Sequence, residues 1–412
     1  MSLIDELQRR WRLLRVHPME LWVVLHSNVH PEHTSIHYNR LQLIAWGSFP
    51  IKSESRTLIQ RAWNLYILLQ INFFIVTTVW ALHEDEDFVA LGQDLLWNCG
   101  MVYLMTKWHF LYFRADKVDD LVNRLDACHR EVKKKHSADE IRAIQRYHYT
   151  IESSLSVLWF FGIGMFIGLI ATLPVYTNQK LPFHAIFPFG WHDPDRHPYA
   201  HAAVYVWQIF ALINNMYALL FLDLLSVHIF FQLAANMKIL CVELRYMSKL
   251  NRHDVALYRS ELRRICIFHQ KILGLVELTN EVFYGPMIMQ MIVSFFLISL
   301  STFISLVARH DPSVAARFML FMVLSFLHLS YWCIAGNMVN EHAFNVAGAA
   351  FDAYEWSPPV PEIQRDIAFI IRRAQKSLSM GAAPFPPLNL TSYMAILKQC
   401  YSILTLMLES LD

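Results

Sequence analysis

Histidines and carboxylates are the residues of this 412-residue chain whose spacing could support metal or acid–base chemistry. One series has helical spacing, which can bring imidazoles onto one face of a helix where they could share a metal ion: His26, His30, His33 and His37. Pro31 interrupts that series, and no cluster of carboxylates accompanies it in the sequence. We therefore expect no metal site there.

A second group of histidines and acids lies between residues 177 and 201, where we expect it to be solvated: His184, His192, His197 and His201 with Asp193 and Asp195. The cysteines and histidines lack the spacing of a zinc site. No convincing His/Asp/Ser or metal constellation falls at one membrane depth, which a membrane hydrolase would need. The sequence thus predicts no cofactor, no metal and no enzyme.

Ionisable residues inside apolar stretches are the remaining candidates, because such residues are costly in lipid and are functional by default. Lys398 lies in the apolar run 385–408 and should face water or a partner carboxylate. Asp94 and Asp223 lie in two other apolar runs, where they either act in function or bond to neighbouring helices. The surroundings of these three side chains depend on how the helices that carry them are arranged.

Composition and hydrophobic runs place the chain among all-α, polytopic membrane proteins. Hydrophobic residues make up 55% of the chain and charged residues only 17%, against roughly 25% charged in a soluble domain. The net charge of +1 gives no reason to expect nucleic acid as a partner. Seven apolar runs are long enough to be transmembrane helices, and the fourth is long enough to continue past the lipid: 62–82, 88–113, 153–176, 202–232, 283–307, 318–340 and 385–408.

The distribution of Lys and Arg predicts the orientation. If the N-terminus is cytoplasmic, the inner segments carry 29 of these residues and the outer segments 4. Because positive charge accumulates on the cytoplasmic side, the N-terminus should be cytoplasmic and the C-terminus extracellular. This predicts a multi-pass protein of the cell membrane, opposite in orientation to G-protein-coupled receptors.

Four segments follow from this layout. Residues 1–61 form a cytoplasmic N-terminal segment with a short re-entrant or amphipathic helix, and residues 62–340 hold transmembrane helices one to six. Residues 341–384 are expected to form a cytoplasmic anchor region, in which 361–380 is an amphipathic helix with Ile363, Ile367, Ile370 and Ile371 on one side. This helix either packs against other helices or lies on the membrane surface. Residues 385–412 form helix seven, whose recurring polar residues favour a pore-lining helix: Lys398, Gln399, Ser402 and Thr405.

The end of the chain resembles the terminal signature of insect odorant receptors, a seven-span family with inverted topology. After a proline-containing break come Leu390–Thr391–Ser392–Tyr393, Ile396–Leu397–Lys398 and Tyr401–Ser402–Ile403–Leu404–Thr405–Leu406. The stretch after the sixth run, from Gly336 to Glu341 and then Ala349, Phe351, Tyr354 and Trp356, is similar to the family's aromatic pair before the last helices.

This resemblance implies a ligand-gated, non-selective cation channel that assembles as a heterotetramer in membrane lipid. In such a channel a variable subunit binds a small volatile odorant and works with a shared co-receptor. The co-receptor has a long insertion between spans four and five, whereas residues 233–282 are short here, so the chain resembles the odorant-specific subunit of a sensory neuron dendrite. The alternatives are a gustatory-type receptor channel and an inverted seven-span receptor that signals without conducting.

The resemblance also implies two sets of site residues. The outer halves of spans two, three, four and six would surround the odorant: Leu91, Leu95, Phe161, Met165, Gly168, Thr172, Gln208, Ala211, Ile213, Asn215, Phe318, Phe321, Met322 and Ser325. In the last helix, Leu406 falls where an apolar gate is expected, with Glu409 at the mouth and Ser402 and Lys398 in the pore; plain helix packing is the alternative for Leu406. The aromatic loop 177–201 would form either a lid over this pocket or an interfacial belt.

Overall fold

The computed structural model describes residues 3–27, 31, 33–47, 58–81, 88–131, 138–176, 180–250, 254–354, 360–381 and 384–409. His30 and Trp356, which entered the sequence analysis, lie outside these ranges. The regular elements in the described ranges are helices, namely α1 (Leu3–Ser27), α2 (Ser35–Trp46), α3 (Leu58–Ala81), α4 (Phe88–Phe113), α5 (Ala115–Glu131), α6 (Ala138–Tyr176), α7 (Pro198–Tyr246), α8 (Val255–Val282), α9 (Tyr284–Val307), α10 (Pro312–Asp352), α11 (Pro361–Ala374) and α12 (Leu390–Glu409), with short 3₁₀ turns between some of them.

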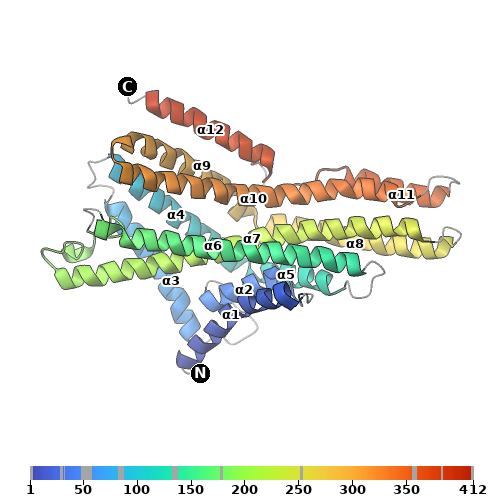
Figure 1. Ribbon diagram of the computed structural model, residues 1–412, viewed down its shortest axis with the longest axis horizontal. Helices are drawn as coiled ribbons and strands as arrows, with labels where there is room; N and C mark the ends of the chain where they lie inside the picture. The colour runs from blue at the N-terminus through green and yellow to red at the C-terminus, as the bar shows by residue number, and fades with distance from the viewer. Residues whose placement is uncertain are drawn as a thin grey trace.

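The helices run back and forth along the long axis of the molecule (Figure 1). The C-terminal ends of α6 and α9 and the N-terminal ends of α7 and α10 lie together at the left end of this view. The far ends of α7 and α10, with α8 and α11, form the opposite end, and α1 and α2 lie along the lower side. Helices of 39, 49 and 41 residues in α6, α7 and α10 exceed the roughly 20 residues that cross a bilayer, so they extend well beyond it.

Helix α7 is the centre of the fold. Of the residues in its most apolar stretch, 94% are buried inside the protein. Helix α7 packs against α2, α4, α6, α8 and α10. A helix that is covered on all sides reads as hydrophobic all round, which is why its sequence shows no apolar stripe. The 202–232 run continues as a helix, as predicted, because α7 goes on without a break to Tyr246. That this continuation lies beyond the lipid stays a prediction.

By length and composition, the described residues contain five helices suited to crossing a membrane: Ala62–Ala81, Ala138–Thr172, Pro198–Lys249, Tyr284–His310 and Val314–Asp352. These coincide with five of the seven predicted spans. Helices α4 and α12 are not among them, and both carry charge, Asp94 and Lys107 in the first and Lys398 in the second. That they span, and the orientation of the termini, stay predictions.

Helix α11 has the amphipathic face that the sequence predicts. Ile363, Ile367 and Ile370 are buried, and α11 packs along α10. The helix is shorter than predicted, because it ends at Ala374 and the chain then turns to bury Met380. The backbone N–H of Leu388 donates to the carbonyl of Met380 at 2.7 Å, which closes this turn ahead of α12.

Helix α12 lies along α9 and α10 by one face only (Figure 1). Ile396 and Cys400 are buried there, and Leu404, Met407 and Leu408 pack onto a cluster formed by α4, α9 and α10. The opposite face is not covered by any of the residues that the structure describes.

We predict that Gly336→Ala loosens the attachment of α12. A Cβ atom at Gly336 in α10 would overlap the carbonyl oxygen of Leu388, whereas at Gly348 of the same helix it would meet nothing within 4 Å. Overpacking of this kind costs about 1–3 kcal/mol. Gly336→Ala should therefore lower the melting temperature of the detergent-solubilised protein, and Gly348→Ala should leave it unchanged or raise it. Equal behaviour of the two variants would contradict this packing.

Candidate functional site

A small cavity lies inside the helix bundle between α4, α6, α7, α9 and α10. Its volume is about 160 Å³, and it is lined by Leu96, Trp97, Gly100, Tyr103, Trp159, Ile163, Phe166, Met216, Leu219, Leu220, Asp223, Leu224, Leu297, Phe321, Leu324, Ser325, His328 and Tyr331. An apolar cavity of roughly 150 Å³ is large enough to hold a benzene-sized molecule. Its size and lining suit a small, mostly apolar ligand.

Aromatic rings form one wall of this cavity. The rings of Trp97 and Phe321 meet edge to face at 5.2 Å between centroids, and those of Phe166 and Phe321 at 5.1 Å. Edge-to-face contacts of this kind add to the burial of apolar area, so the three rings hold one another in place. Gly100 widens the cavity, since a Cβ atom there would meet nothing within 4 Å.

A buried network of charges forms the polar end of the cavity. Asp223 of α7 pairs with Lys107 of α4, and both side chains are almost completely buried. His328 Nε2 donates to the second carboxylate oxygen at 3.0 Å, and Trp332 Nε1 donates to the first at 3.2 Å. A buried charge is tolerated only when it is paired and hydrogen-bonded, and Asp223 meets both conditions.

Gln290 of α9 completes the network. Its amide oxygen accepts from Lys107 Nζ at 3.3 Å and from the hydroxyl of Tyr103, and its amide nitrogen donates to Ser294 at 2.9 Å. The same nitrogen lies 3.4 Å from Nδ1 of His328. Because a carboxylate can only accept, His328 carries its proton on Nε2 and accepts at Nδ1. Four helices, α4, α7, α9 and α10, are thereby joined at one depth.

The first half of the aromatic loop covers the end of the bundle where α6 ends and α7 begins (Figure 1). Phe183 is 1% exposed and meets Trp97 edge to face at 4.5 Å. Gln208 of α7 holds the Phe183 backbone by two hydrogen bonds of 3.1 Å, one to its N–H and one to its carbonyl. Farther along, Phe189 and Tyr199 are 82% and 91% exposed. The part of the loop around Phe183, called the lid from here on, is packed onto the bundle, and the part with Phe189 and Tyr199 is exposed. A lid over a bound ligand and an aromatic belt at the membrane interface both stay predictions.

A second, more polar cavity of about 310 Å³ lies outside this lid. It is lined by Ala90, Gln93, Asp94, Lys180, Leu181, Phe183, His184, Ala185 and His192. Asp94 is buried and its carboxylate lies 2.9 Å from Nδ1 of His184. Phe183 borders this second cavity and contacts Trp97, which lines the inner one, so these two side chains lie between the cavities.

The sequence-predicted pocket residues of α10 lie closest to the inner cavity. Phe321 and Ser325 line it, Met322 is partly buried beside them, and Phe318 is fully buried in a neighbouring cluster with Leu96. In α6 the predicted stripe is exposed on the outside of the bundle: Phe161, Met165, Gly168 and Thr172. The stripe beside it, with Ile163 and Phe166, lines the cavity instead.

The remaining predicted pocket residues lie around the cavity without lining it. Gln208 holds the lid, Ala211 is buried, and Ile213 packs on the cluster that contains Trp97 and Phe183. Asn215 is buried and donates to the sulfur of Met101 at 3.5 Å. In α4, Leu91 is partly buried and Leu95 is 38% exposed, while their neighbours Leu96 and Trp97 line the cavity.

The predicted pore residues share the uncovered face of α12. Lys398, Ser402, Leu406 and Glu409 are all exposed, Leu406 at 66%. Spacing of three and four residues places them along one side of the helix. None of them packs into the described core, so these four side chains are free to face water or another chain.

Sequence reasoning named Asp223 but not its partners, and of the eighteen residues that line the cavity it placed only Phe321 and Ser325 in the pocket. Lys107 and His328 lie in apolar runs, and their partner Asp223 lies in a different run. The separation along the chain is 116 residues for Lys107 and 105 residues for His328. The available signal was the pairing of signs, since an acid and a base in two different spans can neutralise each other. Trp97, Trp159 and Tyr331 carried no comparable signal.

The fold is that of a multi-pass helical membrane protein with a small internal cavity. The 7tm odorant receptor family matches residues 87–401, about three quarters of the chain, and the chain belongs to this family. Its members are receptors and not enzymes. The resemblance seen in the terminal motif is thus confirmed.

Relatives and solved structures agree with this assignment. The chain is 37% identical to odorant receptor 47b of Drosophila melanogaster over 92% of each chain, and 34% identical to odorant receptor 65a of the same species over 95% of each. The fold matches that of the olfactory receptor OR5 from Machilis hrabei in complex with eugenol, with a TM-score of 0.72 and 16% identity over 91% of this chain and 100% of that one.

We predict that Lys107→Met destabilises the protein strongly, because it leaves the Asp223 carboxylate buried without its cation. Breaking a buried pair from one side costs about 3–5 kcal/mol. The variant should show a lower melting temperature in detergent and less protein at the cell surface. The double variant Lys107→Met with Asp223→Asn removes both charges and should recover part of the loss. A double variant as unstable as the sum of the single ones would argue against the pair.

Proposed function

We propose that this chain is the odorant-binding subunit of a heteromeric, ligand-gated, non-selective cation channel. The single observation that supports this most is the inner cavity, which combines apolar walls with one polar end. Volatile molecules offer large apolar surfaces and few polar groups, so such a cavity fits them better than it fits ionic or strongly hydrated ligands.

The lining defines the ligand class further. Aromatic rings and leucines surround the body of the ligand, and Ser325, Tyr103 and His328 stand where a single polar group would lie. Because Asp223 is already paired with Lys107, the network is neutral overall and favours an uncharged ligand. The proposed agonist is therefore a small, neutral, largely apolar volatile with one hydrogen-bonding group.

A continuous apolar contact connects this cavity with α12. Leu96 and Leu297 line the cavity and also belong to the cluster that contains Phe318. Leu404 and Leu408 of α12 pack on the same cluster. A ligand that spreads the cavity walls would move this cluster and thereby α12, provided that it binds the open state more tightly than the closed one.

The exposed face of α12 is the proposed pore lining. Leu406 would form an apolar ring with the same helix of neighbouring subunits and block ions by dewetting, and Glu409 would concentrate cations at the mouth. Lys398 would then face the water of the pore and not lipid. The same reasoning implies seven spans, a cytoplasmic N-terminus, a cell-membrane location and co-receptor subunits as partners.

The proposed function is tested by patch clamp of cells that express this chain with an insect odorant co-receptor. A panel of neutral volatiles should evoke cation current within milliseconds without added nucleotide. The co-receptor alone should not respond to the same volatiles. A response that requires nucleotide would favour a receptor that signals without conducting, and tastants in place of volatiles would favour a gustatory-type receptor.

We predict that Phe321→Ala weakens agonist binding while Phe161→Ala does not. Both were predicted from the sequence to contact ligand, but Phe321 lines the cavity and Phe161 is 65% exposed on the outside of α6. Loss of ring contacts on the order of 1.4 kcal/mol corresponds to a tenfold change in affinity. The agonist concentration for half-maximal current should rise about tenfold for Phe321→Ala only. Similar shifts for both variants would contradict the cavity as the agonist site.

We predict that Leu406→Ala raises the resting current, since a smaller side chain in the constriction allows water and ions to enter. Leu65→Ala is the matched control, because Leu65 is also exposed, at 56%, but lies on α3. Resting current and ion permeability are measured in the heteromer, with surface protein quantified for each variant. Well-expressed Leu406→Ala channels with unchanged current and permeability would remove Leu406 from the gate.

A further inference from the structure

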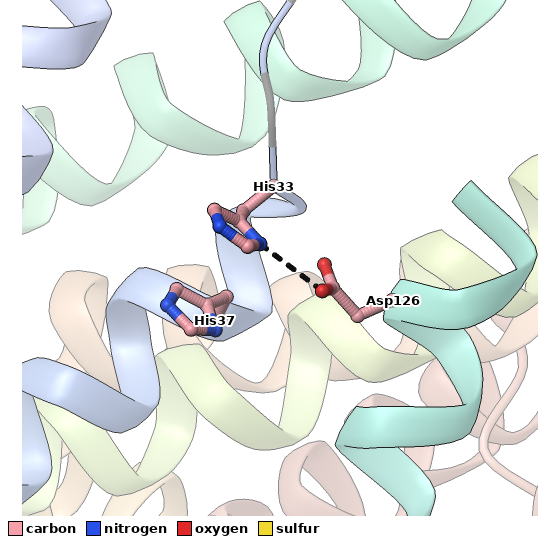
Figure 2. A group of neighbouring side chains, drawn as sticks. All are labelled: His33, His37 and Asp126. Carbon is pink, nitrogen blue, oxygen red and sulfur yellow. Dashed lines mark hydrogen bonds and ion pairs between the residues drawn. The ribbon is translucent and has the colours of Figure 1, made fainter. Parts of the chain in front are cut away.

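A group of three side chains of types that bind metals lies outside the cavity, where the N-terminal segment meets α5. Figure 2 shows His33 just before α2 and His37 in its first turn, with Asp126 facing them from α5. The two imidazole rings lie nearly parallel, with centroids 4.2 Å apart and planes 14° apart. The proposed function makes no use of these residues.

The ligand atoms of this group are close enough to share one ion. His33 Nδ1 lies 3.1 Å from Asp126 Oδ2, and one ligand atom from each of the three side chains lies within 4.8 Å of the other two. Two ligands on a tetrahedral Zn²⁺, each at about 2.0–2.1 Å, are about 3.4 Å apart. The His33–Asp126 spacing of 3.1 Å, now a hydrogen bond, is close to this value. Zn²⁺ would replace the proton on His33 Nδ1, which would be released to water with the neutral imidazole keeping its proton on Nε2, and a rotation of the His37 ring would bring the third ligand atom in.

The carboxylate is held in the orientation that such a site needs. Its Oδ1 accepts from the Thr34 N–H at 3.1 Å and from the Thr34 hydroxyl at 3.3 Å, which turns Oδ2 toward the histidines. His129 Nε2 lies 3.1 Å from the carbonyl oxygen of Pro31, a second contact between α5 and the same segment. Hydrogen bonds that orient a ligand in this way are typical of metal sites.

The residue types also suit a cation, because imidazole and carboxylate are common zinc ligands.

We propose that His33, His37 and Asp126 bind one Zn²⁺ ion, with water in the fourth position. The sequence argued against a metal among these histidines because no carboxylate cluster accompanies them. The fold brings a single carboxylate to them, that of Asp126, which lies 93 residues after His33 in the chain. By binding His37 of α2 and Asp126 of α5 at once, the ion would crosslink these two helices.

Arg130 is the competitor for this site. Its Nη2 lies 3.6 Å from Asp126 Oδ2, and its side chain is 57% exposed, so it can turn into solvent when a cation binds. Arg40, the other nearby cation, is already paired with Asp119 at 2.8 Å. Removing Arg130 should therefore strengthen metal binding, which is the opposite of what removing a ligand does.

The test uses the full chain purified in detergent with Co²⁺ as a visible probe that Zn²⁺ displaces. The ligand variants are His37→Ala and Asp126→Asn, whose amide oxygen can still accept from Thr34. Arg130→Gln removes the competitor. His26→Ala is the matched control, because His26 lies on α1 of the same segment, where its ring stacks on Trp22 outside the cluster. Melting temperature without metal checks the fold of each variant.

We expect one Co²⁺ per chain with the intense visible absorption of tetrahedral coordination, displaced by Zn²⁺. Binding should weaken at least about tenfold in His37→Ala and Asp126→Asn, stay unchanged in His26→Ala and tighten in Arg130→Gln. Absence of a tetrahedral spectrum in the wild-type chain would overturn the proposal. So would wild-type affinity in a folded His37→Ala chain, or equal losses in His26→Ala and His37→Ala. Channel activity does not enter this test, so its outcome is independent of the proposed function.

Discussion

The ion pair between Lys107 and Asp223 is the interaction on which the helix bundle depends. Lipid offers no hydrogen bonds, so a charge in the bundle must find its partners within the protein. Asp223 binds groups from α4 and α10, and Gln290 adds α9 to the same network. These contacts fix the relative position of four helices, and the cavity lies where their apolar side chains meet beside this network.

The sequence predicted the elements well because each carries a local signal. Long apolar runs coincide with α6, α7, α9 and α10, and the isoleucine stripe of α11 is buried as the 3.6-residue period requires. The terminal motif identified the family. Such signals depend on residues a few positions apart, so they survive without knowledge of the tertiary structure.

The candidate site was predicted only in part, and α6 shows why. Phe161 and Phe166 are equally apolar, but Phe161 is exposed on the bundle's outer surface and Phe166 lines the cavity. In a membrane protein both faces of a helix are apolar, so hydrophobicity does not distinguish them. The contact between His33 and Asp126 could not be predicted from local patterns either, because the two residues are 93 positions apart and only the fold brings them together. Contacts across the sequence, and not local patterns, define both sites.

The face of α12 that the described residues leave exposed is the structural reason for proposing an assembly of several chains. Ile396 and Cys400 bury one side of the helix, while Lys398 and Leu406 remain exposed on the other. Placing a lysine in lipid costs about 3 kcal/mol or more, whereas water or a neighbouring chain removes most of that cost. An assembly that surrounds a water-filled axis satisfies Lys398 and at the same time gives Leu406 other apolar side chains to meet. The composition of this one helix therefore favours an oligomer in which α12 lies nearest the axis.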